Sequence, residues 1–155
     1  MNEPSELRAF SRSLPMALLR CREAVMARFR PMLRQHGLSE QQWRVLRALS
    51  AAGPLRAGDL AQRTLLSSPS VSRLLKSLSE RQLIRRAASA DDLRAATVSI
   101  TPKGRRLVAR IAPRSEQIYA GIGGAIGPRE LDELYALLDD ATRRLGPAAS
   151  VEDDS

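Results

Sequence analysis

The 155-residue sequence contains one cysteine, one histidine and few aromatic residues, and its apolar runs fall well short of a membrane-spanning helix. A single cysteine, Cys21, excludes an internal disulfide and fits a reducing compartment. The sequence shows no phosphate-binding glycine loop, no nucleophile–base pair and no metal-ligand cluster, so we expect neither an enzyme nor a cofactor. Its first residues lack the apolar stretch of a signal peptide, and we expect a cytoplasmic protein.

Because aromatic residues are scarce, the core must be built from Leu, Ile, Val and Ala, which favours a mainly α fold of one domain. Cys21 has apolar neighbours at helical spacing. We expect a buried thiol there, with an oxidation-sensing thiol as the alternative.

The positive charge is concentrated in one part of the chain. The net charge is +8, and the segment from Pro54 to Arg110 alone holds twelve Lys or Arg residues against four Asp or Glu. The remaining residues are balanced. A polyanion such as DNA favours a concentrated positive face, because each neutralised phosphate releases counterions.

Helix signals divide the chain into short elements. Apolar residues at steps of three and four predict a helix from Ser13 to about His36, with a kink at Pro31. Ser39 and Gln42 have the spacing of a capping box and begin a second helix, which Gly53-Pro54 ends.

The next segments predict a helix pair followed by a hairpin. We expect a short helix within 55–64, a tight turn, and a helix that opens at Ser67 or Ser68 and exposes a polar, basic side. Residues 83–100 then read as a β-hairpin, and helices follow from 102 to about 121–127 and over 128–145. Residues 1–12 and 146–155 are predicted to be flexible tails, the second of them acidic.

This order is that of a winged helix-turn-helix, in which the second helix of the pair enters the major groove and the hairpin approaches the minor groove. The basic segment coincides with it. We therefore expect a mainly α, dimeric winged helix-turn-helix fold of about six helices with a small β-hairpin wing. A winged-helix module used only for protein contacts is disfavoured by the concentrated charge.

Several stretches resemble the MarR family of regulators over about residues 13–145. These are SVSRLLKSLSERQLIRR (70–86), the wing pattern Asp92-Leu93-Arg94, and VSITPKGRRL (98–107). Gln82 departs from the pattern, since the family commonly has glycine at the end of the recognition helix. Residues 13–49 are similar to the branch that represses homoprotocatechuate degradation.

The resemblance implies site residues on DNA. Arg94 would reach the minor groove and Asp92 would orient it, although Asp92 is equally typical of a turn. Arg85 and Arg86 are candidates for phosphate contact or plain solvated strand residues. The major-groove set comprises Ser68, Ser70, Ser72, Arg73 and Lys76.

The resemblance also implies a homodimer. Helices within 13–36 and 102–145 would dimerise, a lobe of about 54–101 would bind DNA, and the operator would be a double-stranded inverted repeat with half-sites about 10 bp apart.

An effector is expected as well: the resemblance suggests a repressor of an aromatic-acid catabolic operon, released by a hydroxyphenyl, hydroxycinnamic or hydroxynicotinic acid. Such a carboxylate needs a cation and an apolar wall. The candidates are Arg20, His36, Trp43 and Arg44, with Arg44 for the carboxylate. Trp43 is equally typical of a core residue, and His36 of a helix cap.

Overall fold

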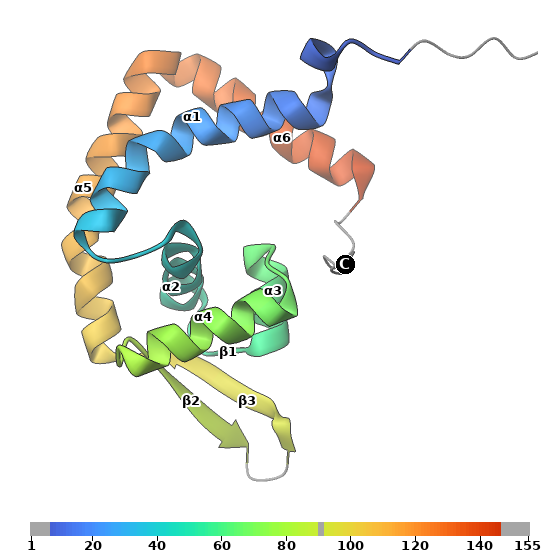
Figure 1. The fold of residues 1–155 in the computed structure, drawn as a ribbon. Helices are drawn as coiled ribbons and strands as arrows, with labels where there is room; N and C mark the ends of the chain where they lie inside the picture. Colours follow the sequence, from blue (N-terminus) through green and yellow to red (C-terminus); the bar gives the residue numbers. More distant parts are fainter. Residues whose placement is uncertain (1–6, 90–91, 147–155) are drawn as a thin grey trace, which may run out of the picture.

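Helices dominate the computed structural model, which describes residues 7–89 and 92–146 (Figure 1). Six α-helices and three strands account for most of these residues; the sequence predicts the helices and two of the strands. Their order along the chain is η1 (Phe10–Arg12), α1 (Leu14–Gln35), α2 (Glu40–Ala52), β1 (Leu55–Arg56), α3 (Ala57–Thr64), α4 (Ser68–Glu80), β2 (Ile84–Ser89), β3 (Asp92–Ile100), α5 (Pro102–Ile126) and α6 (Pro128–Leu145).

The predicted helix starts are confirmed by their caps. Ser39 and Gln42 form both hydrogen bonds of a capping box at the start of α2. Ser67 caps α4 by accepting from the Ser70 N–H, and Thr101 caps α5 by accepting from the Gly104 N–H. Each cap satisfies a backbone donor that the first helical turn leaves free.

α1 continues through Pro31 to Gln35 without a break. Proline removes one backbone donor, but Pro31 and Ala27, whose carbonyl loses its partner, both lie on the exposed side where water can replace the bond. The buried residues that follow, Met32 and Leu33, hold the last turn against the core.

The sheet has the order β1-β3-β2, with both pairings antiparallel. The predicted hairpin is β2–β3. β1 was not predicted from the sequence; it is only two residues long and pairs Leu55 with Val98 and Arg56 with Thr97. The 3-10 turn of η1, inside the predicted N-terminal tail, was not predicted either. Residues 1–6 and 147–155, which make up most of the predicted flexible tails, lie outside the described residues.

One core joins the C-terminal part of α1 with α2, α3, α4, the sheet and the packed face of α5. Its fully buried side chains include Leu46, Leu60, Val71, Leu78 and Ile111. It fixes the orientation of α4 relative to the sheet, and therefore the face that α4 presents outward.

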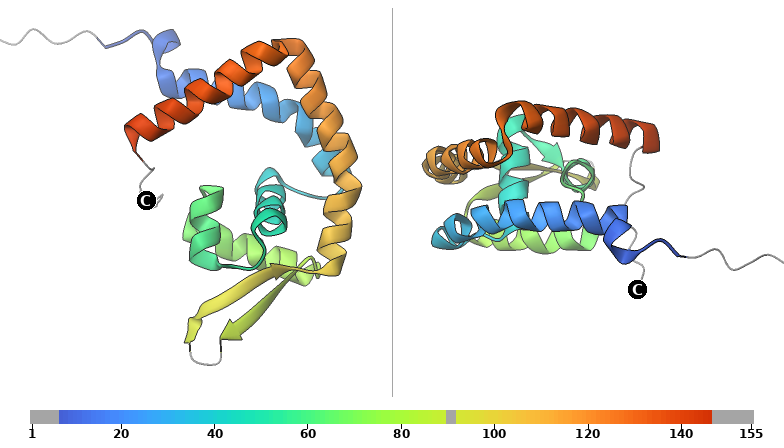
Figure 2. Two further views of the ribbon diagram at one scale, coloured as in Figure 1. Left: turned by 180° about the vertical axis from the view of Figure 1, so that it is seen from behind. Right: turned by 90° about the horizontal axis from the view of Figure 1, so that it is seen from above.

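Two helical arms leave this core. The N-terminal half of α1 and the whole of α6 extend in the same direction from α5, as two separate helices in the right view of Figure 2. Their apolar faces are exposed, including Leu14, Leu18, Tyr135 and Leu138. In this single chain Cys21 is also exposed, so the expectation of a buried thiol is wrong: its stretch of α1 has left the core.

None of the described helices combines the length and the hydropathy needed to cross a bilayer.

Candidate nucleic-acid interface and ligand site

α4 presents a polar, basic face. Its buried side consists of Val71, Leu75 and Leu78, spaced four and three residues apart. Four of the five predicted major-groove residues are exposed, while Ser70 is half-buried. The exposed residues are Ser68, Ser72, Arg73 and Lys76.

The start of α4 is ordered by hydroxyl groups. Ser67 donates to Ser70 Oγ at 2.9 Å, and Arg73 Nη2 donates to the same oxygen at 3.3 Å. Ser70 therefore orients Arg73 on the helix surface while leaving most of the guanidinium free. Such a group can read a guanine edge or bind a phosphate.

The wing carries the next predicted contacts. Arg85 and Arg86 are both exposed on β2, opposite Ser99 and Val98 of β3. The backbone of Asp92 and Arg94 belongs to β3, but their side chains lie outside the described part, so their roles remain predictions.

The ion pairs among the described side chains lie outside the basic segment from Pro54 to Arg110. All ion pairs among the described side chains join Arg22 and Arg30 to Glu23 and Glu40, or lie within α6. None involves a cation between Arg56 and Arg110. Among the described side chains, the charge that is clustered in sequence is thus not paired with carboxylates in the fold, which favours a polyanion as the partner.

The end of α4 explains the unusual Gln82. Its φ of 58° is left-handed, and the Leu83 and Gln82 N–H groups donate to the carbonyls of Leu78 and Ser79. This is a Schellman motif, which usually places glycine where Gln82 stands. The departure in sequence therefore leaves the cap geometry intact.

Two of the predicted ligand residues are neighbours on α2. Trp43 is almost fully buried, and Arg44 is half-buried with its Nη1 donating to the Thr64 carbonyl at 2.9 Å. Partial burial lowers the pKa of the Arg44 guanidinium from its ordinary value, and the nearby charge of Arg22 lowers it further. An anion beside Arg44 and Arg22 would relieve both effects.

The other two lie elsewhere. Arg20 is exposed on the free arm of α1, and His36 is the C-cap of that helix, where its carbonyl accepts from Arg81. His36 thus has the capping position that the sequence left open. Neither side chain forms a hydrogen bond or ion pair with Trp43 or Arg44 among the described residues.

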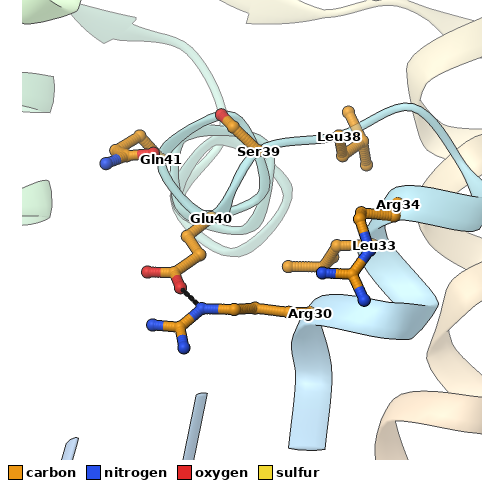
Figure 3. A pocket seen from close by; sticks show the side chains of 7 residues that line it. All are labelled: Arg30, Leu33, Arg34, Leu38, Ser39, Glu40 and Gln41. Carbon is orange, nitrogen blue, oxygen red and sulfur yellow. Dashed lines mark hydrogen bonds and ion pairs between the residues drawn. The ribbon is translucent and has the colours of Figure 1, made fainter. Parts of the chain in front are cut away.

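A shallow depression of about 370 Å³ lies where α1 meets α2 (Figure 3). Arg30, Arg34 and Glu40 line it, with Arg30 bonded to Glu40, and it contains none of the four predicted ligand residues. A second depression of about 320 Å³, beside Ala48 and Arg63, also lacks them. Neither depression is therefore the site that the sequence predicts.

The sequence analysis missed three arginines that the structure places at these sites. Arg47 lies one helical turn after Trp43, with its guanidinium 5.9 Å from the ring centroid. Arg22 joins Glu40 at 2.9 Å. Arg81 donates to the Gly37 carbonyl at 2.7 Å, tying the end of α4 to the end of α1. Only the i, i+4 spacing of Trp43 and Arg47 could have been found without coordinates.

Hydrogen bonds to Glu40 outweigh its burial. Partial burial raises the pKa of this carboxyl, but hydrogen bonds from Arg22 and Arg30 hold it below its ordinary value. Glu40 is therefore an anion that fastens α1 to the first turn of α2.

Comparison with known proteins agrees with this geometry. A family model described as "MarR family" matches residues 36–95. The homoprotocatechuate degradative operon repressor of Escherichia coli is 34% identical over 128 residues, which cover 83% of this chain and 86% of the repressor.

Two solved structures extend the comparison. NadR in complex with 4-hydroxyphenylacetate is 29% identical, with a TM-score of 0.74 over 88% of this chain and 96% of NadR. BpsR of Bordetella bronchiseptica, whose DNA binding is regulated by 6-hydroxynicotinic acid, is 27% identical, with a TM-score of 0.77 over 83% of this chain and 97% of BpsR.

Proposed function

The chain belongs to the MarR family of transcriptional regulators, and from this premise we propose that it represses an aromatic-acid catabolic operon and is released from its operator by a small aromatic acid. The observation that carries the DNA-binding part is the exposed positive charge of α4 and β2, whose described cations form no ion pair with a described carboxylate. Two solved relatives are named with such acids, 4-hydroxyphenylacetate and 6-hydroxynicotinic acid, which supports the effector class.

The DNA contacts follow from exposure and chemistry. We assign Ser68, Ser72, Arg73 and Lys76 to the major groove, with Ser70 orienting Arg73. Arg85 and Arg86 are assigned to phosphates, and Asp92 and Arg94 to the wing tip as the sequence predicts. The operator is expected to be an inverted repeat, since two copies related by a two-fold axis present identical helices.

A homodimer fits the exposed arms. An isolated chain would leave the apolar faces of α1 and α6 in water, and such faces mark interaction sites. A second copy presents the same faces and can cover both. The missing wall of the effector site is then expected from the partner chain.

For the effector we assign Arg44 to the carboxylate and Trp43, with Arg47 above it, to the ring. Arg44 is half-buried and lies close to Arg22, so an anion there gains charge-assisted hydrogen bonds. Arg20 and His36 remain predictions. The effector lowers operator affinity if it binds more tightly to a dimer conformation in which the spacing of the recognition helices does not match the operator. The size of this effect is set by the ratio of the effector's affinities for the two dimer conformations.

The test is DNA binding to the intergenic region upstream of the chain's own gene, measured by gel shift. The titration is repeated with 4-hydroxyphenylacetate, 6-hydroxynicotinate and a hydroxycinnamic acid. Release by one acid supports the proposal, and binding that none of them disturbs contradicts the effector class. Absence of binding contradicts the repressor function itself.

Variants make the effector test specific. Arg44→Met should raise the effector concentration for half-release at least 10-fold and leave effector-free operator affinity within about threefold. The control is Arg28→Met, which removes an exposed arginine of α1 and should change neither quantity. If Arg44→Met needs the same effector concentration for half-release as the wild type, Arg44 does not belong to the effector site.

The alternative regulator senses oxidation through Cys21, and the exposure of that thiol keeps this alternative open. Cys21→Ser separates the two functions. A thiol sensor would lose its response to peroxide, whereas an effector-released repressor would keep its response to the acid.

A further inference from the structure

A row of cations runs along one face of α5. Lys103, Arg106, Arg110 and Arg114 are spaced three, four and four residues apart, so they share a stripe about 16 Å long. All four are exposed. Each stands immediately before a buried residue, the last of these being Ser115, so the stripe borders the packed face of the helix. We call these four residues the α5 track.

The α5 track has no counter-charge. None of its members forms an ion pair with a described side chain, and like charges at this spacing repel each other. Some arginines of other elements are paired with carboxylates, as Arg30 is on α1 and Arg143 on α6, whereas Arg114 of the track donates only to the neutral amide of Gln117 at 3.1 Å. A solvated surface helix would gain from similar pairing, so the unpaired row favours an external anion.

The lower end of the track is fixed beside the DNA-facing elements. Thr101, which caps α5, donates its hydroxyl to the Gln82 carbonyl at the end of α4 and its N–H to the Leu83 carbonyl. Gly104 packs so tightly that a Cβ would lie 2.2 Å from the same Leu83 carbonyl oxygen. Lys103 and Arg106 are therefore rigidly placed next to the base of the wing that carries Arg85 and Arg86.

From that point α5 rises away from the wing towards the arms (Figure 1). Lys103 lies within one turn of the wing base, and Arg110 and Arg114 lie about 10 and 16 Å further along the helix axis than Lys103. These two distances are greater than the Debye length of about 8 Å at physiological salt, so Arg110 and Arg114 act on DNA only if the duplex approaches them.

We propose that the α5 track binds the phosphates of duplex DNA that flanks each half-site, without reading its sequence, and that the flanking duplex bends towards α5 to reach Arg110 and Arg114. The track presents a row of guanidinium and ammonium groups, and the DNA backbone presents evenly spaced phosphates that such groups bind. The track extends the DNA interface beyond α4 and the wing, and it needs DNA binding by this family but neither the aromatic operon nor the effector.

The experiment compares short and long duplexes at several salt concentrations. Fluorescence anisotropy gives the slope of log K against log salt for a random 20-bp duplex and for a random 50-bp duplex. We expect a steeper slope on the long duplex. Arg110→Gln/Arg114→Gln should reduce it by about 3 to 4, since a dimer then loses four phosphate contacts at about 0.9 each.

Matched controls separate the track from net charge. Arg105→Gln removes the same charge as Arg106→Gln from the neighbouring position, which points away from the track, and it should leave the slope unchanged. Arg28→Gln/Arg34→Gln matches the distal double variant on α1. Circular dichroism checks that all variants keep the wild-type helix content.

Bending provides a second, independent measurement. Energy transfer between dyes at the two ends of the 50-bp duplex should rise when the wild type binds, and rise less with Arg110→Gln/Arg114→Gln. Equal slopes and equal transfer for that variant and the wild type would overturn the proposal. Because the duplexes are random, loss of operator recognition or of effector response leaves this test intact, and failure of the wild type to bind any duplex overturns both proposals.

Discussion

Gln82 adopts a backbone conformation that glycine adopts without strain. Its left-handed φ of 58° costs a non-glycine residue about 1 to 2 kcal/mol, partly offset by the smaller unfolded-state entropy of glutamine. Gln82→Gly should therefore raise the free energy of unfolding by about 0.5 to 1 kcal/mol, measured by urea denaturation. Leu65, which ends α3 with φ of 54°, is the matched site, and Leu65→Gly should shift stability in the same direction. A loss of stability in both variants would contradict this account.

Gly104 is required for a different reason, which is space. An added Cβ would lie 2.2 Å from the Leu83 carbonyl oxygen and 2.7 Å from Ile100 Cγ1, and the first is backbone that cannot rotate away. We expect Gly104→Ala to destabilise the fold by about 3 kcal/mol, as overpacking at a fixed contact does. Gly121→Ala is the control, since nothing lies within 4 Å of its added Cβ. Thermal unfolding of the two variants gives the comparison.

Glu40 makes stability depend on pH in the acid range. Its folded-state pKa is depressed, so its contribution is present above the ordinary glutamate pKa and is lost as pH falls through the folded value. Glu40→Gln should cost about 0.5 to 1 kcal/mol at pH 7, a value reduced for the solvent around the pairs. The difference between variant and wild type should shrink below about pH 4. Urea denaturation across pH measures it, and a constant difference would contradict the assignment.

At the scale of elements, the turn between α1 and α2 is tied to the recognition helix. Arg81 donates to the carbonyls of His36 and Gly37, and Gln42 Nε2 donates to Ser77 Oγ at 3.0 Å. These bonds connect the base of an arm with two turns of α4. A movement of the α1 arm can therefore be transmitted through this turn to α4, the recognition helix.

Arg81→Met should loosen that connection. We expect a loss of about 1 to 2 kcal/mol in stability, because a charged donor leaves two carbonyls, and a several-fold weaker operator affinity. The salt slope of DNA binding should stay unchanged, since Arg81 positions α4 and does not contact phosphate. A slope that falls by about 1 per protomer would instead make Arg81 a phosphate ligand.

At the scale of the molecule, the arms determine assembly. Tyr135 is 52% exposed and Leu138 39% exposed on the same side of α6, so the free chain leaves a large apolar face in water. Tyr135→Glu/Leu138→Glu should produce a monomer by sedimentation equilibrium and abolish operator binding, because one recognition helix contacts only half of an inverted repeat. Glu133→Gln removes a charge two residues before Tyr135, on the other side of α6, where Glu133 pairs with Arg129, and should leave the dimer intact. If the double variant remains a dimer, the dimer interface does not lie on this face of α6.

Local signals in the sequence determined where most elements begin. Ser39 with Gln42, Ser67 with Pro69, and Thr101 with Pro102 are caps whose hydrogen bonds span only three residues, so their spacing suffices. The basic segment and the helix-turn-helix order likewise follow from the chain itself, and they gave the fold class and the DNA-binding family.

Other features depend on contacts between distant residues, and only the tertiary structure decided them. β1 exists because Leu55 meets Val98, and α1 passes Pro31 because its next turn is packed against the core. Cys21 is exposed because its part of α1 leaves that core, and Arg44 is held by the carbonyl of Thr64. The sequence shows how many charges α5 carries, but whether they are neutralised depends on where the carboxylates of other elements lie.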